Sequence, residues 1–163
     1  ADSLAGVLPT IRSRCISFAV APVSPEDCAR YCTAQGVGAK DAALYSALFD
    51  GHIGTVLAAA RDEARREQVD RALALAKAAA ARDSYAAAVL LAAYEKDKAG
   101  ASALLADFRA VAAAGLRDSP HSPVEGETAR KALGAADAAM QQISAQVNPK
   151  IVLSVLAAKF RTF

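Results

Sequence analysis

The chain has 163 residues, of which 19 are basic and 17 acidic, so the formal net charge is only +2. This even balance does not by itself indicate a nucleic-acid-binding protein, although it leaves room for a local basic patch. Much of the 54% hydrophobic fraction is alanine, aromatic residues make up 6%, and tryptophan is absent. The composition therefore favours close-packed helices and argues against a β-sandwich, which needs β-branched and aromatic strands.

Three cysteines, Cys15, Cys28 and Cys32, form an odd and sparse set. Such a set argues against a secreted disulfide scaffold and suits a reducing cytosol, so we predict a cytoplasmic protein. A zinc site needs about four ligands, and no second pair lies near Cys28 and Cys32, so we interpret both as structural. No run of about 18 uncharged apolar residues is present, so no membrane span is predicted. The first residues also lack the pattern of a signal peptide.

The first 62 residues predict a small helical module. Leu8 to Arg14 can form a short helix, and Ile16 to Val20 is the one strand-like run. Ser24 is expected to cap a helix that begins at Pro25 and has acidic residues in its first turn. Three short helices are expected, over residues 25 to 35, 41 to 49 and 53 to 60, with breaks at Gly36 and at Asp50-Gly51.

The rest of the chain predicts five longer helices after a charge-dense stretch, Arg61 to Gln68, which is the best candidate for a domain boundary. The first runs from Arg66 to Ala81, and the second from Asp83 or Ser84 to Lys98, with a break at Ala99-Gly100. The third has the clearest apolar stripe: Ala101, Leu104, Leu105, Phe108, Val111 and Ala112. A loop at 117–126 precedes helices over 127–147 and 149–160, the last capped by Asn148 and with Val152, Val155, Leu156 and Phe160 inward.

Catalytic chemistry is not apparent in the residues. His52 and His121, the two histidines, lack a convincing arrangement of nucleophile and acid around them. No phosphate-binding Gly-x-x-x-x-Gly-Lys-Ser/Thr loop is present, so the chain should not bind ATP on its own. Arg12 and Arg14 can be interpreted in two ways: as a solvated pair on a turn, or as guanidinium groups that reach a phosphate.

Three stretches decide between these alternatives by resemblance. Leu8 to Cys15 reads Leu-Pro-Thr-Ile-Arg-Ser-Arg-Cys and resembles the end of the ATPase core in AAA+ clamp-loader proteins. Ala47 to Leu57 is similar to the lid-helix signature Gly-Ser-x-Arg-x-Ala-Leu, with Gly54 at the position of the sensor arginine. Val147 to Leu156 resembles the final helix of the family. In this order they resemble the delta-prime group of clamp-loader subunits of bacterial DNA polymerase III.

The resemblance implies an all-α architecture: a small three-helix AAA+ lid followed by a five-helix clamp-loader collar. Residues 1–20 would be the end of a truncated ATPase core, 21–62 the lid, and 63–163 the collar, which holds subunits in a ring. Arg14, with Ser13 and Cys15, would be an arginine finger that acts on the ATP of a neighbouring subunit. Gly54 in place of the sensor arginine implies a subunit that does not hydrolyse ATP.

The implied function is that of a scaffold subunit, through which sliding clamps are loaded on primed DNA during replication. Its partners would be the tau/gamma and delta subunits, bound through the collar, with DNA contacted only indirectly and no membrane. The chain would be no enzyme by itself, with no cofactor and no metal, but part of a DNA-directed DNA polymerase, a nucleotidyltransferase complex. Two alternatives are an unrelated all-helical adaptor or regulatory domain, and a DNA-binding domain that uses Arg61, Arg65, Arg66 and Arg71.

Overall fold

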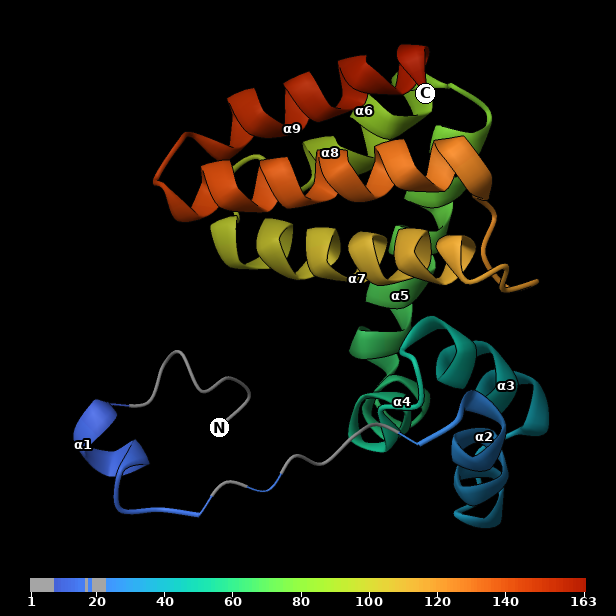
Figure 1. Ribbon diagram of the computed structural model, residues 1–163. Coiled ribbons are helices and arrows are strands. Elements are labelled where there is room, and N and C mark those ends of the chain that lie inside the picture. The colour runs from blue at the N-terminus through green and yellow to red at the C-terminus, as the bar shows by residue number, and fades with distance from the viewer. Residues whose placement is uncertain (1–7, 17, 19–22) are drawn as a thin grey trace.

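The computed structural model describes residues 8–16, 18 and 23–163, and within these ranges it contains helices and no strand. Figure 1 shows the arrangement of the helices. Their bounds are α1 Pro9–Arg12, α2 Pro25–Ala34, α3 Ala39–Leu48, α4 Ile53–Arg61, α5 Glu63–Ala80, α6 Ser84–Ala92, α7 Lys98–Leu116, α8 Gly126–Ser144, α9 Pro149–Lys159 and the 3-10 turn η2 Phe160–Thr162. The prediction of an all-helical chain is confirmed for the described residues.

Helices α2, α3 and α4 form a three-helix module, as the spacing of apolar residues predicts. Ser24 caps α2 by accepting a hydrogen bond from the Asp27 N–H at 3.1 Å, and Pro25 occupies the first helical position. The core of the module is formed by large or polarisable side chains: Cys28, Cys32, Tyr45, Leu48, Phe49 and Val56. Both cysteines of α2 are fully buried, whereas Tyr31 on the same helix is 47% exposed.

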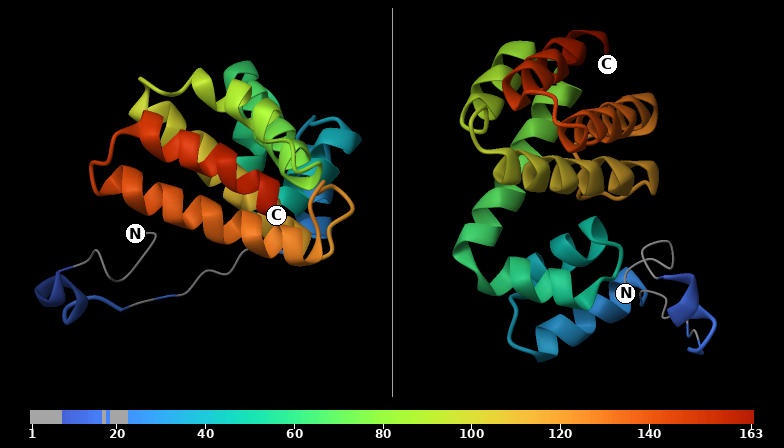
Figure 2. Two further views of the ribbon diagram at one scale, coloured as in Figure 1. Left: turned by 90° about the horizontal axis from the view of Figure 1, so that it is seen from above. Right: turned by 90° about the vertical axis from the view of Figure 1, so that its left-hand side faces the viewer.

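Helices α5 to α9 form a five-helix bundle, the predicted number. The most extensive packing is between α7 and α8, and α5 packs on α7 while α6 packs on α9. Figure 2 shows α5 running from the bundle down to the module. Every residue of the stripe predicted on α7 is buried, and Phe108 stacks on Phe160 with ring centroids 5.8 Å apart. Many of the remaining core positions are alanines, whose small side chains let the helices approach closely.

The predicted boundary between α6 and α7 is wrong. Helix α6 ends at Ala92 rather than at Lys98, and Gly100 lies inside the first turn of α7 instead of breaking a helix. The cause is Asp97, whose side chain caps α7 by accepting a hydrogen bond from the Gly100 N–H at 2.9 Å. A Cβ at position 100 would lie 2.3 Å from a carboxylate oxygen of Asp97. The glycine therefore makes room for the cap and does not mark a stop.

Five helices end in the same way, with a residue of positive φ followed by a backbone bond to the last turn. The positive-φ residues are Gly36, Asp50, Arg82, Asp118 and Gln146. After each of them the next N–H donates to a carbonyl five residues back, as from Asp83 N to Ala78 O at 2.9 Å. This is the Schellman arrangement, which glycine favours because it has no Cβ. Four of the five positions are not glycine, so a search for glycines misses these helix ends.

The start of the described chain is exposed. Helix α1 confirms part of the short helix predicted over 8–14, and it lies to one side of the helical body in Figure 1. Of the strand-like run, Ile16 and Phe18 are described and each is 84% exposed, while residues 17, 19 and 20 lie outside the described residues. At the other end of the chain, Val155 was expected to point inward and is exposed instead.

By length and composition, one described helix, α7, could cross a membrane. Half of its apolar window is buried inside the molecule, against α5 and α8, and it carries the charged residues Asp107 and Arg109. The core helix of a helical bundle has these same properties, so the finding is weak evidence for a membrane span.

Candidate functional site

The predicted finger, Arg14, lies in an exposed turn directly after α1. Pro9 begins this one-turn helix, and the Arg14 N–H donates to the Ile11 carbonyl at 3.0 Å. The Ser13 hydroxyl donates to the Thr10 carbonyl at 3.1 Å, and Cys15 is a free, exposed thiol. Within the described ranges, no ion pair or hydrogen bond joins the side chain of Arg14 to another group. Its guanidinium can therefore offer its donors to an external anion.

The position expected for a sensor arginine is Gly54, near the start of α4. It is exposed, and a Cβ placed there would meet nothing within 4 Å. Packing therefore does not require glycine at this position, and a longer side chain would fit. His52 precedes the helix but makes no side-chain capping bond. The start of α4 thus presents no cationic side chain at the position to which the resemblance assigns a sensor arginine.

The other titratable groups do not assemble into a catalytic centre. Among the described residues, no group of three or more His, Cys, Asp or Glu could hold a metal ion. Cys28 and Cys32 are fully buried on α2, and burial, together with the neighbouring Cys28, raises the pKa of the Cys32 thiol. A raised pKa lowers the fraction of reactive thiolate, so this pair suits a structural role.

Two of the hollows in the surface lie beside α4 to α7. A cavity of about 270 Å³ lies between α4 and α7 and is lined by Phe49, His52, Thr55, Arg109 and Arg117, among others. Its arginines already have acidic partners: the Arg109 Nε lies 2.5 Å from Asp137 and the Arg117 Nε lies 3.5 Å from Asp50. A more open groove of about 530 Å³ runs between α5 and α6, and its lining includes Ala78, Ala81, Tyr85 and Val89. Small and apolar side chains dominate this groove, as at a surface that receives another helix.

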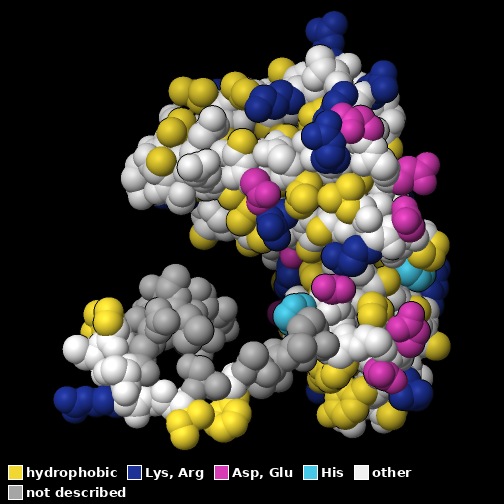
Figure 3. Space-filling model, viewed as in Figure 1, with side chains coloured by type: hydrophobic (Ala, Val, Ile, Leu, Met, Phe, Trp, Pro, Cys, Tyr) yellow, Lys and Arg dark blue, Asp and Glu magenta, His cyan; other side chains and the backbone are white. Residues whose placement is uncertain are grey.

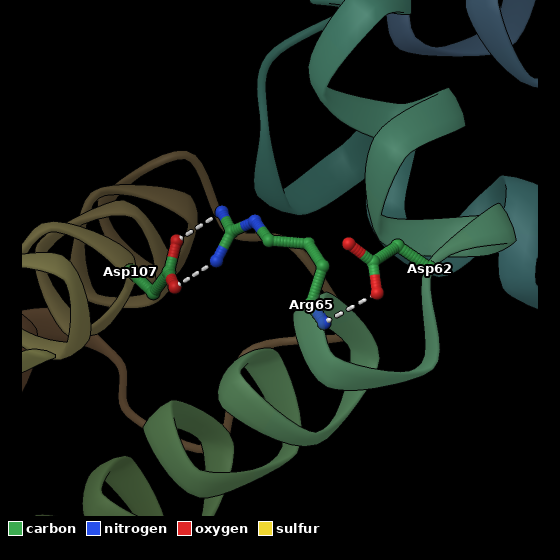
Figure 4. A network of polar contacts seen from close by, with 3 residues as sticks. All are labelled: Asp62, Arg65 and Asp107. Carbon is green, nitrogen blue, oxygen red and sulfur yellow. Dashed lines mark hydrogen bonds and ion pairs between the residues drawn. The ribbon is translucent and has the colours of Figure 1, made fainter.

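The most buried ion pair among the described residues joins α5 to α7, close to the module, and the sequence patterns do not reveal it. Arg65, in the first turn of α5, binds both carboxylate oxygens of Asp107 on α7, with 2.6 Å between Nη2 and Oδ1. Figure 4 shows the guanidinium pointing toward Asp107, while the backbone N–H of Arg65 bonds to Asp62. The hydrogen bonds that the guanidinium donates to Asp107 raise the pKa of Arg65, so the guanidinium stays charged.

The same guanidinium also reaches the module. Its carbon atom Cζ lies 5.6 Å from the centroid of the Phe49 ring, at the end of α3, which is a cation–π distance. One signal in the sequence could have revealed this contact. Asp107 is a carboxylate between Leu105 and Phe108 on the apolar stripe of α7, and a buried acid needs a partner. The identity of that partner, 42 residues away, follows only from the fold.

The four arginines considered as a DNA-binding patch all have partners within the chain. Arg61 donates to the Gln35 carbonyl at 3.2 Å, and Arg71 donates to the Tyr94 hydroxyl at 3.0 Å. Arg66 donates to the Ala60 carbonyl at 2.7 Å and lies 3.6 Å from Asp41, while Arg65 is held by Asp107. Figure 3 shows basic and acidic side chains side by side at the waist of the molecule. This mixture of charges does not favour binding to a polyanion.

Comparisons of the chain with protein-family models, with curated proteins and with solved structures found no match. The family resemblance of the three short stretches therefore stays a prediction.

Proposed function

We propose that this chain is the lid and collar part of a clamp-loader subunit of the delta-prime type, and that Arg14 acts as its arginine finger. The observation that carries the proposal is the exposed Ser13-Arg14-Cys15 turn after α1, within the segment that resembles the end of a clamp-loader ATPase core. A planar, permanently charged guanidinium supplied to a neighbour's ATP would stabilise charge on the phosphoryl group in the transition state.

Two further features support the proposal. Gly54 leaves the start of α4 without a sensor arginine, as in a subunit that assists hydrolysis without performing it. A module of three helices is followed by a bundle of five, the numbers expected for a lid and a collar. In this proposal the module belongs to the AAA+ part, and the bundle joins the subunit to the tau/gamma and delta subunits.

Co-elution tests the assembly half of the proposal. The purified chain is mixed with tau/gamma and delta subunits of the same organism and analysed by size-exclusion chromatography. We expect a joint peak, because the bundle would supply the subunit contacts. Separate elution under conditions in which complete subunits assemble would contradict the proposal.

The finger is tested by Arg14→Ala in the complete subunit. We expect loss of hydrolysis at the one ATP site that Arg14 faces, where a trans arginine contributes about 10³-fold or more to kcat. Assembly should be unchanged. Arg14→Lys should not restore hydrolysis, because a lysine lacks the planar fork. Arg30→Ala is the matched control, since Arg30 is also exposed but pairs locally with Asp27. Unchanged ATPase activity in Arg14→Ala would remove this residue from the mechanism.

A protein-interaction module unrelated to clamp loaders is the second candidate, and the groove between α5 and α6 favours it. Val89 is 57% exposed on that groove and Tyr85 is 79% exposed. If the groove forms the collar contact, Val89→Glu should abolish the joint peak without loss of helix. If the wild-type chain gives no joint peak, the adaptor is the better explanation of the groove.

A further inference from the structure

Arg65, Asp107 and Phe49 form a contact between three helices, which we call the junction latch. Arg65 stands in the first turn of α5, Asp107 in the middle of α7 and Phe49 at the end of α3. We infer that the junction latch fixes the three-helix module on the five-helix bundle in one orientation, and that loss of Arg65 alone releases the module. This inference is independent of the proposed function.

The backbone between the two parts offers little resistance to bending. Asp62 ends α4 and caps α5 in an extended conformation, with φ −104° and ψ 117°, so a single residue separates the two helices. Backbone hydrogen bonds of one helix do not continue into the next across such a residue. The orientation of the module must therefore be held by side chains.

Beside the apolar packing of α3 on α7 and of α4 on α5, three arginines of the bundle contact α3 or the turn after it. Arg117 donates from Nη2 to the Ala47 carbonyl at 3.2 Å and lies 3.5 Å from Asp50. Arg66 lies 3.6 Å from Asp41, and about half of its side chain is exposed. Exposed contacts of this kind contribute little to stability, because water competes for the charges. Arg65 differs in two ways. Its pair with Asp107 lies inside the bundle, where the two side chains are only 24% and 5% exposed, and its guanidinium also lies 5.6 Å from the Phe49 ring of the module.

Because the pair is largely buried, removing Arg65 alone should have a different effect from removing Arg65 and Asp107 together. A bidentate pair with a ring stacked on the guanidinium satisfies both charges without water. If Arg65 is removed, the carboxylate of Asp107 stays in the interior without a partner, which is far more costly than losing an exposed pair. The molecule can relieve this cost by opening the junction, because opening brings water to Asp107. Replacing both residues by apolar ones removes the buried carboxylate, so the open junction no longer gains stability from hydrating it.

The test measures the distance between the module and the bundle with two spin labels. Gly38 and Gly134 are suitable sites, since each is exposed and a Cβ at either position meets nothing within 4 Å. Both are changed to cysteine in a Cys15→Ser background, and the fully buried Cys28 and Cys32 are protected from labelling. The unchanged junction should give a single narrow distance distribution by pulsed electron spin resonance.

Arg65→Met should broaden that distribution and shift the opening equilibrium by about 30-fold toward the open form. Arg65→Met/Asp107→Leu should restore the narrow distribution. The control is Arg130→Met, which removes an equally bidentate pair, with 2.8 and 2.6 Å to Glu127, from the exposed face of α8. This control should leave the distribution narrow.

A narrow distribution in a folded Arg65→Met variant, or no narrowing in the double variant, would overturn the inference. Helical circular dichroism separates opening from unfolding. If Arg65→Met does not fold, Arg65→Lys replaces it: this change keeps the charge but loses the second hydrogen bond and the planar face over Phe49. An intermediate width is then expected, and the wild-type width would overturn the inference. Because the labelled chain is measured alone, this result is independent of any failure to assemble with clamp-loader subunits.

Discussion

The three-helix module and the five-helix bundle reach the same all-helical class by different means. The bundle has helices of 18 and 19 residues, α5, α7 and α8, and its core combines alanines with one aromatic cluster. The module has helices of 9 and 10 residues that enclose a few large side chains, and the buried Ser46 hydroxyl finds no hydrogen-bond partner among the described residues. Long helices bury enough surface to stabilise one another, whereas short ones depend on their turns and on a neighbouring body. The module should therefore be the less stable of the two parts.

The largest effect should come from the aromatic cluster of the bundle. Phe108→Ala removes a fully buried ring that stacks on Phe160, which in turn lies 4.9 Å from the ring of Phe163. We expect a loss of about 3–5 kcal/mol in the free energy of unfolding, measured by urea denaturation. Tyr85→Ala, on an exposed face of α6, should change it by less than about 0.5 kcal/mol. A loss below about 1 kcal/mol in Phe108→Ala would show that the bundle does not depend on this cluster.

The turn of the module gives the next largest effect. Gly51 has φ +72°, and a Cβ there would lie 1.8 Å from the carbonyl oxygen of Val23. Gly51→Ala should therefore cost at least about 1–2 kcal/mol from the left-handed conformation alone, with the steric clash in addition. Amide hydrogen exchange should localise the loss of protection to α2–α4.

Gly54→Ala is the matched control for this glycine, since it lies in α4 with open space around it. Here alanine should stabilise the helix by up to about 1 kcal/mol. If Gly51→Ala lowered protection equally in the module and in the bundle, the two parts would unfold as one cooperative unit, and the module would not be the less stable part.

The smallest effect concerns a helix end in the bundle. Arg82 follows α5 with φ +55°, a conformation that costs a side-chain-bearing residue energy and costs glycine almost none. Arg82→Gly should raise the thermal midpoint, by a gain of up to about 1 kcal/mol, measured by calorimetry. A lower midpoint would mean that the Arg82 side chain contributes more than its backbone conformation costs. Comparing the stability changes of Gly51→Ala and Arg82→Gly shows whether turns affect the stability of the module more than that of the bundle.

The candidate site has one part that the sequence predicted and one part that it did not. The exposed turn at Ser13-Arg14-Cys15 was predicted from a local motif, and its role stays a prediction. The ion pair of Arg65 and Asp107 was not predicted, because the sequence shows the two charged residues but not that they meet. In the sequence Arg65 is one member of the charge-dense stretch from Arg61 to Gln68, and its 24% side-chain exposure reflects a partner 42 residues further along the chain. Sequence patterns show that a buried acid needs a partner, but they do not say which one.

The sequence by itself determined the helical class, the apolar stripe of α7 and the starts of α2 and α9. Those starts are marked by Ser24 and Asn148, each followed by proline, and such signals act within one helical turn. Only the tertiary structure decided that Gly100 belongs to a capped helix, that Val155 faces outward, and that Asp50, Arg82, Asp118 and Gln146 take a positive φ at helix ends. The reason is physical: a positive φ at an ordinary residue and a charge inside a bundle are tolerated only when contacts from distant segments offset their cost.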